Sequence, residues 1–90
     1  MNLISYDLRA TNPEKNVFRF YKLCAGKDLF GHWSVTANYG RQGTKGQVKG
    51  WTYNTLEEAQ KHIEVSLKKR DTAQKRIGVN YVVKEYSIDI

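Results

Sequence analysis

An alternating segment that runs directly into a glycine-containing turn limits what this chain can fold into. Between residues 33 and 39, aromatic and apolar side chains occupy every second position, with Ser, Thr and Asn between them. This period of two predicts a strand with one buried face, ending at Tyr39. The turn that follows contains three glycines and two cations: Gly40, Gly43, Gly46, Arg41 and Lys45. Glycines let a ligand approach the backbone closely. Together with an aromatic ring and two cations, such a turn suits a sugar-phosphate ligand.

Four further segments have the pattern of strands, separated by short turns. The expected strands are residues 3–8, 16–24, 47–53 and 81–88, and the expected turns are residues 11–14 and 25–28. Ile4, Tyr6 and Leu8 face inward in the first of these strands. Residues 33–39 and 47–53 should pair as a hairpin, because the connection between them is short.

A single helix is predicted over residues 55–70. Thr55 and Glu58 have the spacing of a capping box, in which each residue satisfies a backbone group of the other. Its apolar face has members at intervals of three and four: Leu56, Ala59, Ile63, Leu67 and Arg70. The helix closes on Lys68, Lys69 and Arg70. Two interpretations of these cations are open: they stabilise the negative end of the helix dipole, or they form a phosphate-facing patch continued by Lys75 and Arg76.

These elements predict an α+β fold, an antiparallel sheet of four to five strands with one helix packed on one face. Residues 71–78 are expected to be irregular. Strands do not alternate with helices, which argues against a doubly wound nucleotide-binding fold. Ninety residues suffice for one sheet-and-helix core, so we expect residues 1–90 to form a single domain.

The charge of the chain favours an anionic partner. Lys and Arg number 15 against 9 Asp and Glu, which gives a formal net charge of +6 and a pI of about 9.6. The usual partner of such a surface is nucleic acid or an anionic membrane surface, although many basic domains carry only solvated charge. The first residues lack the basic and apolar regions of a signal peptide, and no apolar run reaches membrane-spanning length. We therefore expect a cytoplasmic protein without membrane association.

No group of residues indicates catalysis, a metal or a cofactor. Cys24 is the only cysteine, and it has no metal-ligand spacing with His32 or His62. Nucleophilic catalysis needs a base beside the nucleophile, and neither this pattern nor a pair of carboxylates is evident. The glycines spell G-x-x-G twice, as in KH domains, but this loop joins two strands rather than two helices. We expect a binding module rather than an enzyme.

The aromatic side chains divide into core candidates and one candidate for stacking. The core candidates are Phe18, Phe20, Trp33 and Trp51, because a small domain needs large rings for burial. Tyr39 stands where a strand leaves the sheet, one glycine before an arginine. Its ring either stacks on a sugar or base or has a structural role, and both interpretations are open.

Four segments in order, residues 16–23, 28–35, 39–47 and 56–59, resemble the WGR domain. The resemblance covers about residues 14–83 and is stronger to the small, stand-alone bacterial members than to the copies in poly(ADP-ribose) polymerases. It implies the strand and helix order given above. It also implies that the signature turn contacts DNA near strand breaks and bridges to neighbouring domains.

Within the signature, Gly40 and Arg41 match the family, and the resemblance makes Arg41 a phosphate or interdomain contact. Tyr39 stands where the family has tryptophan, so its stacking area is smaller. Ninety residues are too few for the catalytic ADP-ribosyl transferase domain of the polymerases, so no polymerase activity is expected.

Two hypotheses for function follow. In the first, the chain binds nucleic acid, with DNA preferred, through phosphate contacts and little base readout. Its site residues are Tyr39, Gly40, Arg41, Lys45, Lys49, Arg19, Lys75 and Arg76. In the second, Tyr39 and Arg41 anchor a partner protein, because tyrosine and arginine often dominate interfaces.

Overall fold

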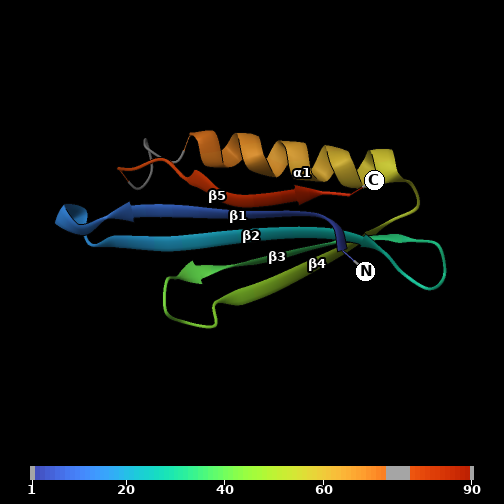
Figure 1. Cartoon of the computed structure of the whole chain (residues 1–90), viewed down its shortest axis with the longest axis horizontal. Helices are drawn as coiled ribbons and strands as arrows, with labels where there is room; N and C mark the ends of the chain where they lie inside the picture. The colour runs from blue at the N-terminus through green and yellow to red at the C-terminus, as the bar shows by residue number, and fades with distance from the viewer. Residues whose placement is uncertain (1, 73–77, 90) are drawn as a thin grey trace.

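A five-stranded antiparallel sheet with one helix on one face makes up the computed structural model, which describes residues 2–72 and 78–89 (Figure 1). The strands are β1 (Asn2–Asn12), β2 (Val17–Lys27), β3 (Trp33–Arg41), β4 (Gln47–Tyr53) and β5 (Val82–Ile88); the helix is α1 (Leu56–Asp71), and η1 (Pro13–Lys15) is a short 3-10 helix. Their order in the sheet is β4-β3-β2-β1-β5, so the last strand lies beside the first. The predicted α+β class is confirmed.

The β1–β2 hairpin is longer than the alternation predicted. Each strand has 11 residues. The turn predicted at residues 11–14 begins only at Pro13, whose fixed backbone starts η1. Asn16 then takes a left-handed conformation with a φ of 55°, which asparagine tolerates better than most residues, and reverses the chain into β2.

The turn predicted at residues 25–28 is wrong, because β2 continues through most of this segment. Ala25 is completely buried and pairs with both β1 and β3. The chain reverses directly after β2, where the Asp28 carboxylate accepts from the N–H groups of Phe30 and His32 at 2.9 and 2.8 Å. An aspartate that bonds to backbone N–H groups ahead of it is a common way to close a loop.

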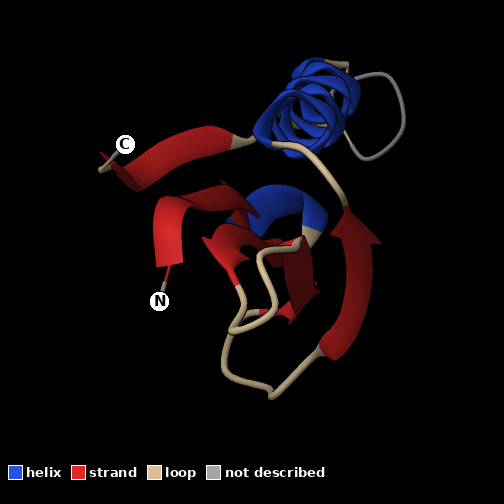
Figure 2. Cartoon of the chain, turned by 90° about the vertical axis from the view of Figure 1, so that its right-hand side faces the viewer, coloured by secondary structure: helices blue, strands red, loops and turns tan. Residues whose placement is uncertain are grey.

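Helix α1 begins where the sequence predicts. The Thr55 hydroxyl accepts from the Glu58 N–H at 3.2 Å and donates to the Glu58 carboxylate at 3.1 Å. The helix contacts β3 and β4, and Figure 2 shows it along one side of the curved sheet. Ala59 and Ile63 of the predicted apolar face are buried, together with Ser66.

The core lies between α1 and the face of the sheet that the helix covers. Its buried members come from β1, β2, β3 and α1: Ile4, Leu8, Tyr21, Leu23, Ala25, Val35, Ala37, Ala59 and Ile63. Tyr6, Trp33 and Trp51 are only partly buried and pack against this cluster. Phe20 is buried, as predicted, but it stands outside this cluster, on the opposite face of the sheet from its neighbour Tyr21.

Candidate nucleic-acid interface

The turn between β3 and β4 packs closely against Phe20, and this contact requires a glycine. Phe20 is 5% exposed although it stands outside the core cluster. Gly46 has a φ of +70°, which favours glycine, and a Cβ atom there would lie 2.7 Å from Phe20 Cζ and against the Tyr39 carbonyl oxygen. This glycine therefore serves the packing of the turn.

Gln42 fastens the same turn to the neighbouring strands. Its backbone N–H donates to the Phe18 carbonyl at 2.8 Å. Its side-chain amide donates to Thr11 Oγ1 at 2.9 Å and to the Arg19 carbonyl at 3.0 Å. Sequence reasoning missed this residue, because its side-chain partners are 31 and 23 positions away and no local pattern marks them.

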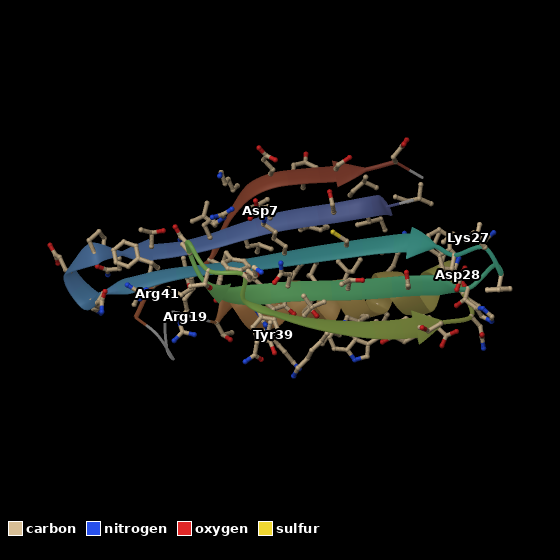
Figure 3. The ribbon with its side chains drawn as sticks, turned by 90° about the horizontal axis from the view of Figure 1, so that it is seen from below. Asp7, Arg19, Lys27, Asp28, Tyr39 and Arg41 are labelled. Carbon is tan, nitrogen blue, oxygen red and sulfur yellow. The ribbon has the colours of Figure 1, made fainter. Side chains whose placement is uncertain are left out.

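Arg19 and Arg41 lie opposite each other in the β2–β3 ladder, and both are exposed. With Lys15 they line a hollow of about 480 Å³, and among the described residues no carboxylate lines it. Arg41 Nη2 donates to Asn16 Oδ1 at 3.1 Å, and the guanidinium carbon lies 5.2 Å from the centroid of the Phe18 ring. Lys15, Arg19 and Arg41 are together called the arginine cluster. Lys27 is not part of it and lies at the opposite end of the sheet (Figure 3).

Tyr39 has a structural role and keeps a partly exposed ring. It stacks on Tyr21, with ring centroids 5.7 Å apart and an interplanar angle of 23°. Its hydroxyl donates to Gln47 Oε1 at 3.3 Å, and Lys49 Nζ lies 5.9 Å from the ring centroid. The ring is thus held in one orientation with surface left for a ligand.

The structure separates the two lysines predicted together on the hairpin. Lys49 lines a groove with Tyr39, whereas Lys45 lines a different hollow, of about 390 Å³, with Arg9 and Lys22. Lys45 and Lys49 are four positions apart, which would place both side chains on one face of a continuous strand. The glycine turn interrupts the strand, so the two side chains lie on different surfaces. The structure brings Lys49, and not Lys45, beside Tyr39.

The last turn of α1 adds cations near Tyr39. Arg70 lies over the ring of Tyr21, with its guanidinium carbon 3.7 Å from the ring centroid. Lys69 lines the same groove as Tyr39. The predicted continuation of this patch, Lys75 and Arg76, lies outside the described residues and stays a prediction.

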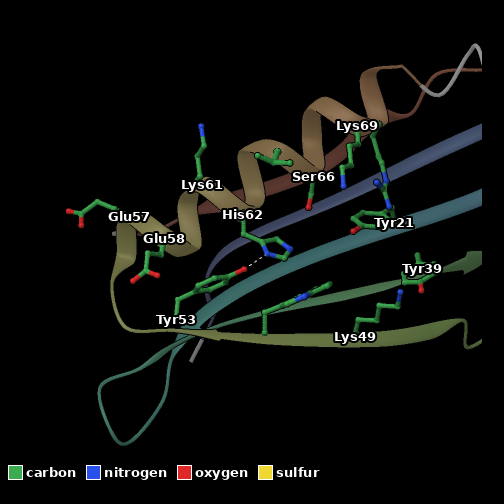
Figure 4. A pocket seen from close by; sticks show the side chains of 13 residues that line it. Tyr21, Tyr39, Lys49, Tyr53, Glu57, Glu58, Lys61, His62, Ser66 and Lys69 are labelled. Atoms are coloured by element: carbon green, nitrogen blue, oxygen red, sulfur yellow. Dashed lines mark hydrogen bonds between the residues drawn. The ribbon is translucent and has the colours of Figure 1, made fainter.

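A groove of about 910 Å³ runs between α1 and β4 (Figure 4). Its rings are Tyr21, Tyr39, Trp51, Tyr53 and His62, and its cations are Lys49, Lys61, Lys69 and Arg70. Glu57 and Glu58 line it at the first turn of the helix. The sequence did not predict this groove, because its walls combine residues of four elements that only the fold brings together.

His62 is held inside the groove by two aromatic neighbours. Its ring centroid lies 4.3 Å from that of Trp51, and its Nδ1 is hydrogen-bonded to the Tyr53 hydroxyl. Burial, and secondly the charge of Lys69, hold the pKa of His62 below its ordinary value. His62 therefore contributes to the groove at pH 7 mainly as a neutral ring.

Three further features of the described residues concern thiol reactivity, metal binding and membrane spanning. Burial raises the pKa of the Cys24 thiol, which keeps this half-buried side chain protonated. Within residues 2–72 and 78–89, no group of three His, Cys, Asp or Glu side chains is placed to hold a metal ion. No helix in this part of the chain is long and apolar enough to cross a membrane.

Comparison with known proteins adds to these observations. No curated protein matches the chain. A family model described as the WGR domain matches residues 5–76, a span that includes the β3–β4 turn with Tyr39, Gly40 and Arg41. In known proteins this domain is associated with binding of DNA and of strand breaks. The match covers well over half of the 90 residues, so the chain belongs to the WGR domain family, as the resemblance implied.

Proposed function

We propose that this chain is a nucleic-acid-binding module that holds DNA by its phosphates at the arginine cluster. The observation that supports the proposal is the placement of Arg19 and Arg41 directly opposite each other. Like charges in this arrangement repel, and an anion bound between them would relieve the repulsion. Asn16 engages only Nη2 of Arg41, so the guanidinium keeps donors for a phosphate, whose geometry it matches.

Tyr39 and Lys49 extend this site away from the cluster. In this proposal the Tyr39 ring, which is partly exposed and stands two residues before Arg41, contacts a sugar. Binding of this kind is mainly electrostatic, falls with salt and shows little base preference, because its contacts are to phosphates rather than to base edges. The family's association with strand breaks makes DNA ends the preferred ligand within this proposal.

Fluorescence-anisotropy titration tests the proposal. Short duplexes that are blunt, nicked or gapped, with and without a 5′ phosphate, are titrated at several salt concentrations. We expect Arg41→Ala to weaken binding across sequences and to reduce the slope of log K against log salt by about one unit. Lys27→Ala is the matched control, because it removes an exposed cation at the opposite end of the sheet (Figure 3).

An unchanged salt slope in Arg41→Ala would remove Arg41 from the site. Equal losses in Arg41→Ala and Lys27→Ala would show that only net charge matters and would overturn the proposal. In that case the protein-adaptor hypothesis, with Tyr39 and Arg41 as its anchors, becomes the better one. A protein partner retained after nuclease treatment would support that alternative.

A further inference from the structure

We infer that the groove between α1 and β4 binds a single-stranded extension of the nucleic acid held at the arginine cluster, an inference that rests on the proposed function. Sites for single strands combine cations that follow the phosphates with aromatic rings on which bases stack. The groove has both, and it lies next to the proposed phosphate site because Tyr39 lines it two residues before Arg41.

The rings that bases would contact are those of Tyr39 and Trp51. Both are partly exposed and line the groove from adjacent strands of the sheet. Tyr39 is fixed by its stacking on Tyr21, and Trp51 by its contact with His62. Rings that are already held in place lose little freedom when a base stacks on them.

Cations stand on both sides of these rings. Lys49 projects from β4, while Lys69 and Arg70 come from the last turn of α1 across the groove (Figure 4). A phosphate backbone between the helix and the strand would therefore meet positive charge from both sides. This arrangement suits a single nucleic-acid strand, which carries one negative charge at each nucleotide.

The size of the groove suits a short single-stranded segment. Its volume, about 910 Å³, is within the range of small-ligand sites, about 300–1,000 Å³. Unpaired nucleotides fit such a site.

The charge along the groove is uneven, and it predicts how far the bound nucleic-acid strand extends. Glu57 and Glu58 lie near Tyr53 at the start of α1, whereas Lys69 lies at the Tyr39 end (Figure 4). Phosphates are repelled from the acidic end. The bound segment is therefore short, running from the arginine cluster past Tyr39 towards Trp51.

A comparison of blunt and extended duplexes tests the inference on the intact chain. One duplex is prepared blunt and with extensions of about four to six nucleotides on either strand, a length within the site sizes of single-strand modules. We expect one of the extended forms to bind about tenfold more tightly than the blunt form, as one or two stacked bases would give. Lys49→Glu should remove this gain. Lys27→Glu, the same change at an exposed lysine at the opposite end of the sheet, should keep it.

Tryptophan fluorescence gives an independent readout of stacking. Trp33→Phe leaves Trp51 as the only tryptophan in the chain. We expect the extended duplex to quench Trp51 emission and the blunt duplex to leave it unchanged. The comparison of Lys49→Glu with Lys27→Glu carries the test if Trp33→Phe does not fold.

The two proposals fail in different ways. If no duplex binds, or if Arg41→Ala matches Lys27→Ala, the proposed function fails. If blunt duplex binds in an Arg41-dependent way but extensions add nothing and Trp51 emission is constant, only the groove assignment is overturned. Quenching of Trp51 by an oligoglutamate peptide, with none by the extended duplex, would also overturn it and would make the groove a site for acidic peptides.

Discussion

Arg70 of α1 lies over the ring of Tyr21 in β2, with its guanidinium carbon 3.7 Å from the ring centroid. Tyr21 in turn stacks on Tyr39, so one continuous set of contacts joins the end of the helix to the start of the signature turn. The position of the helix end, and with it the basic side of the groove, is thereby linked to the orientation of Tyr39.

Loss of the Arg70 contact should destabilise the fold. Arg70→Ala removes a cation–π interaction with a ring that is only 5% exposed, and it also removes the packing of the arginine stem. We expect the free energy of unfolding to fall by about 1–2 kcal/mol, measured by urea denaturation. Lys68→Ala, at a side chain 76% exposed in the same turn, should change it by less than about 0.5 kcal/mol. Equal effects would show that the contact contributes nothing.

Two glycines of the β3–β4 turn should differ in their tolerance of a methyl group. Gly43 has a φ of +88° with nothing within 4 Å of a Cβ position, so Gly43→Ala should cost only the backbone penalty of about 1–2 kcal/mol. Gly46→Ala adds a clash with Phe20 and should cost about 3 kcal/mol or more. Thermal unfolding of both variants measures the difference. If the costs are the same, the turn can shift to accept the methyl group.

Stability should fall in mild acid because of His62. The pKa of His62 in the folded chain lies below its ordinary value, so the unfolded chain binds the proton first as the pH falls. The free energy of unfolding should therefore be highest above about pH 6.5 and decrease below it. Urea unfolding at pH 7.5, 6.5 and 5.5 checks this. His62→Phe should show a smaller decrease, and an identical decrease would assign the effect to other groups.

The ion pair of Asp7 and Arg9 should stabilise the fold only where the carboxylate is charged. Arg9 donates from Nε and Nη2 to the two Asp7 oxygens at 2.9 and 3.2 Å, and this bonding holds the pKa of Asp7 below its ordinary value. The contribution is present above about pH 4 and is lost as the pH falls through the folded pKa.

Asp7→Asn tests this pair. We expect it to lower the free energy of unfolding by about 1 kcal/mol at pH 7, with a smaller difference near pH 3. Glu64→Gln is the control, since its pair with Lys68 is exposed and 3.8 Å long and should contribute close to nothing. A loss for Asp7→Asn that is the same at both pH values would show that the effect is not electrostatic.

Local signals were sufficient to predict several elements. The capping residues Thr55 and Glu58 stand three positions apart, and their bond marks the start of α1 where the sequence places it. The alternation of residues 47–53 reproduces the bounds of β4, and its pairing with β3 is confirmed. In each case the determining interactions lie within a few residues or across one short hairpin.

The remaining features depend on distant contacts. Ala25 and Gly26 have the composition of a turn, yet both are buried because β1 and β3 flank them. The separation of Lys45 from Lys49 follows from the path of the glycine turn, which alternation does not describe. The groove requires the end of α1 to lie across from β4, a relationship that no stretch of the sequence contains.

The hydrogen bonds of Gln42 hold the β3–β4 turn in place. They join the turn to β1 and β2 through partners within the chain itself. The loss of conformational entropy in the turn is therefore a cost of folding rather than of association, and a ligand at Arg41 meets a preorganised surface. Loosening the turn would thus lower affinity even if every contact with the ligand were retained.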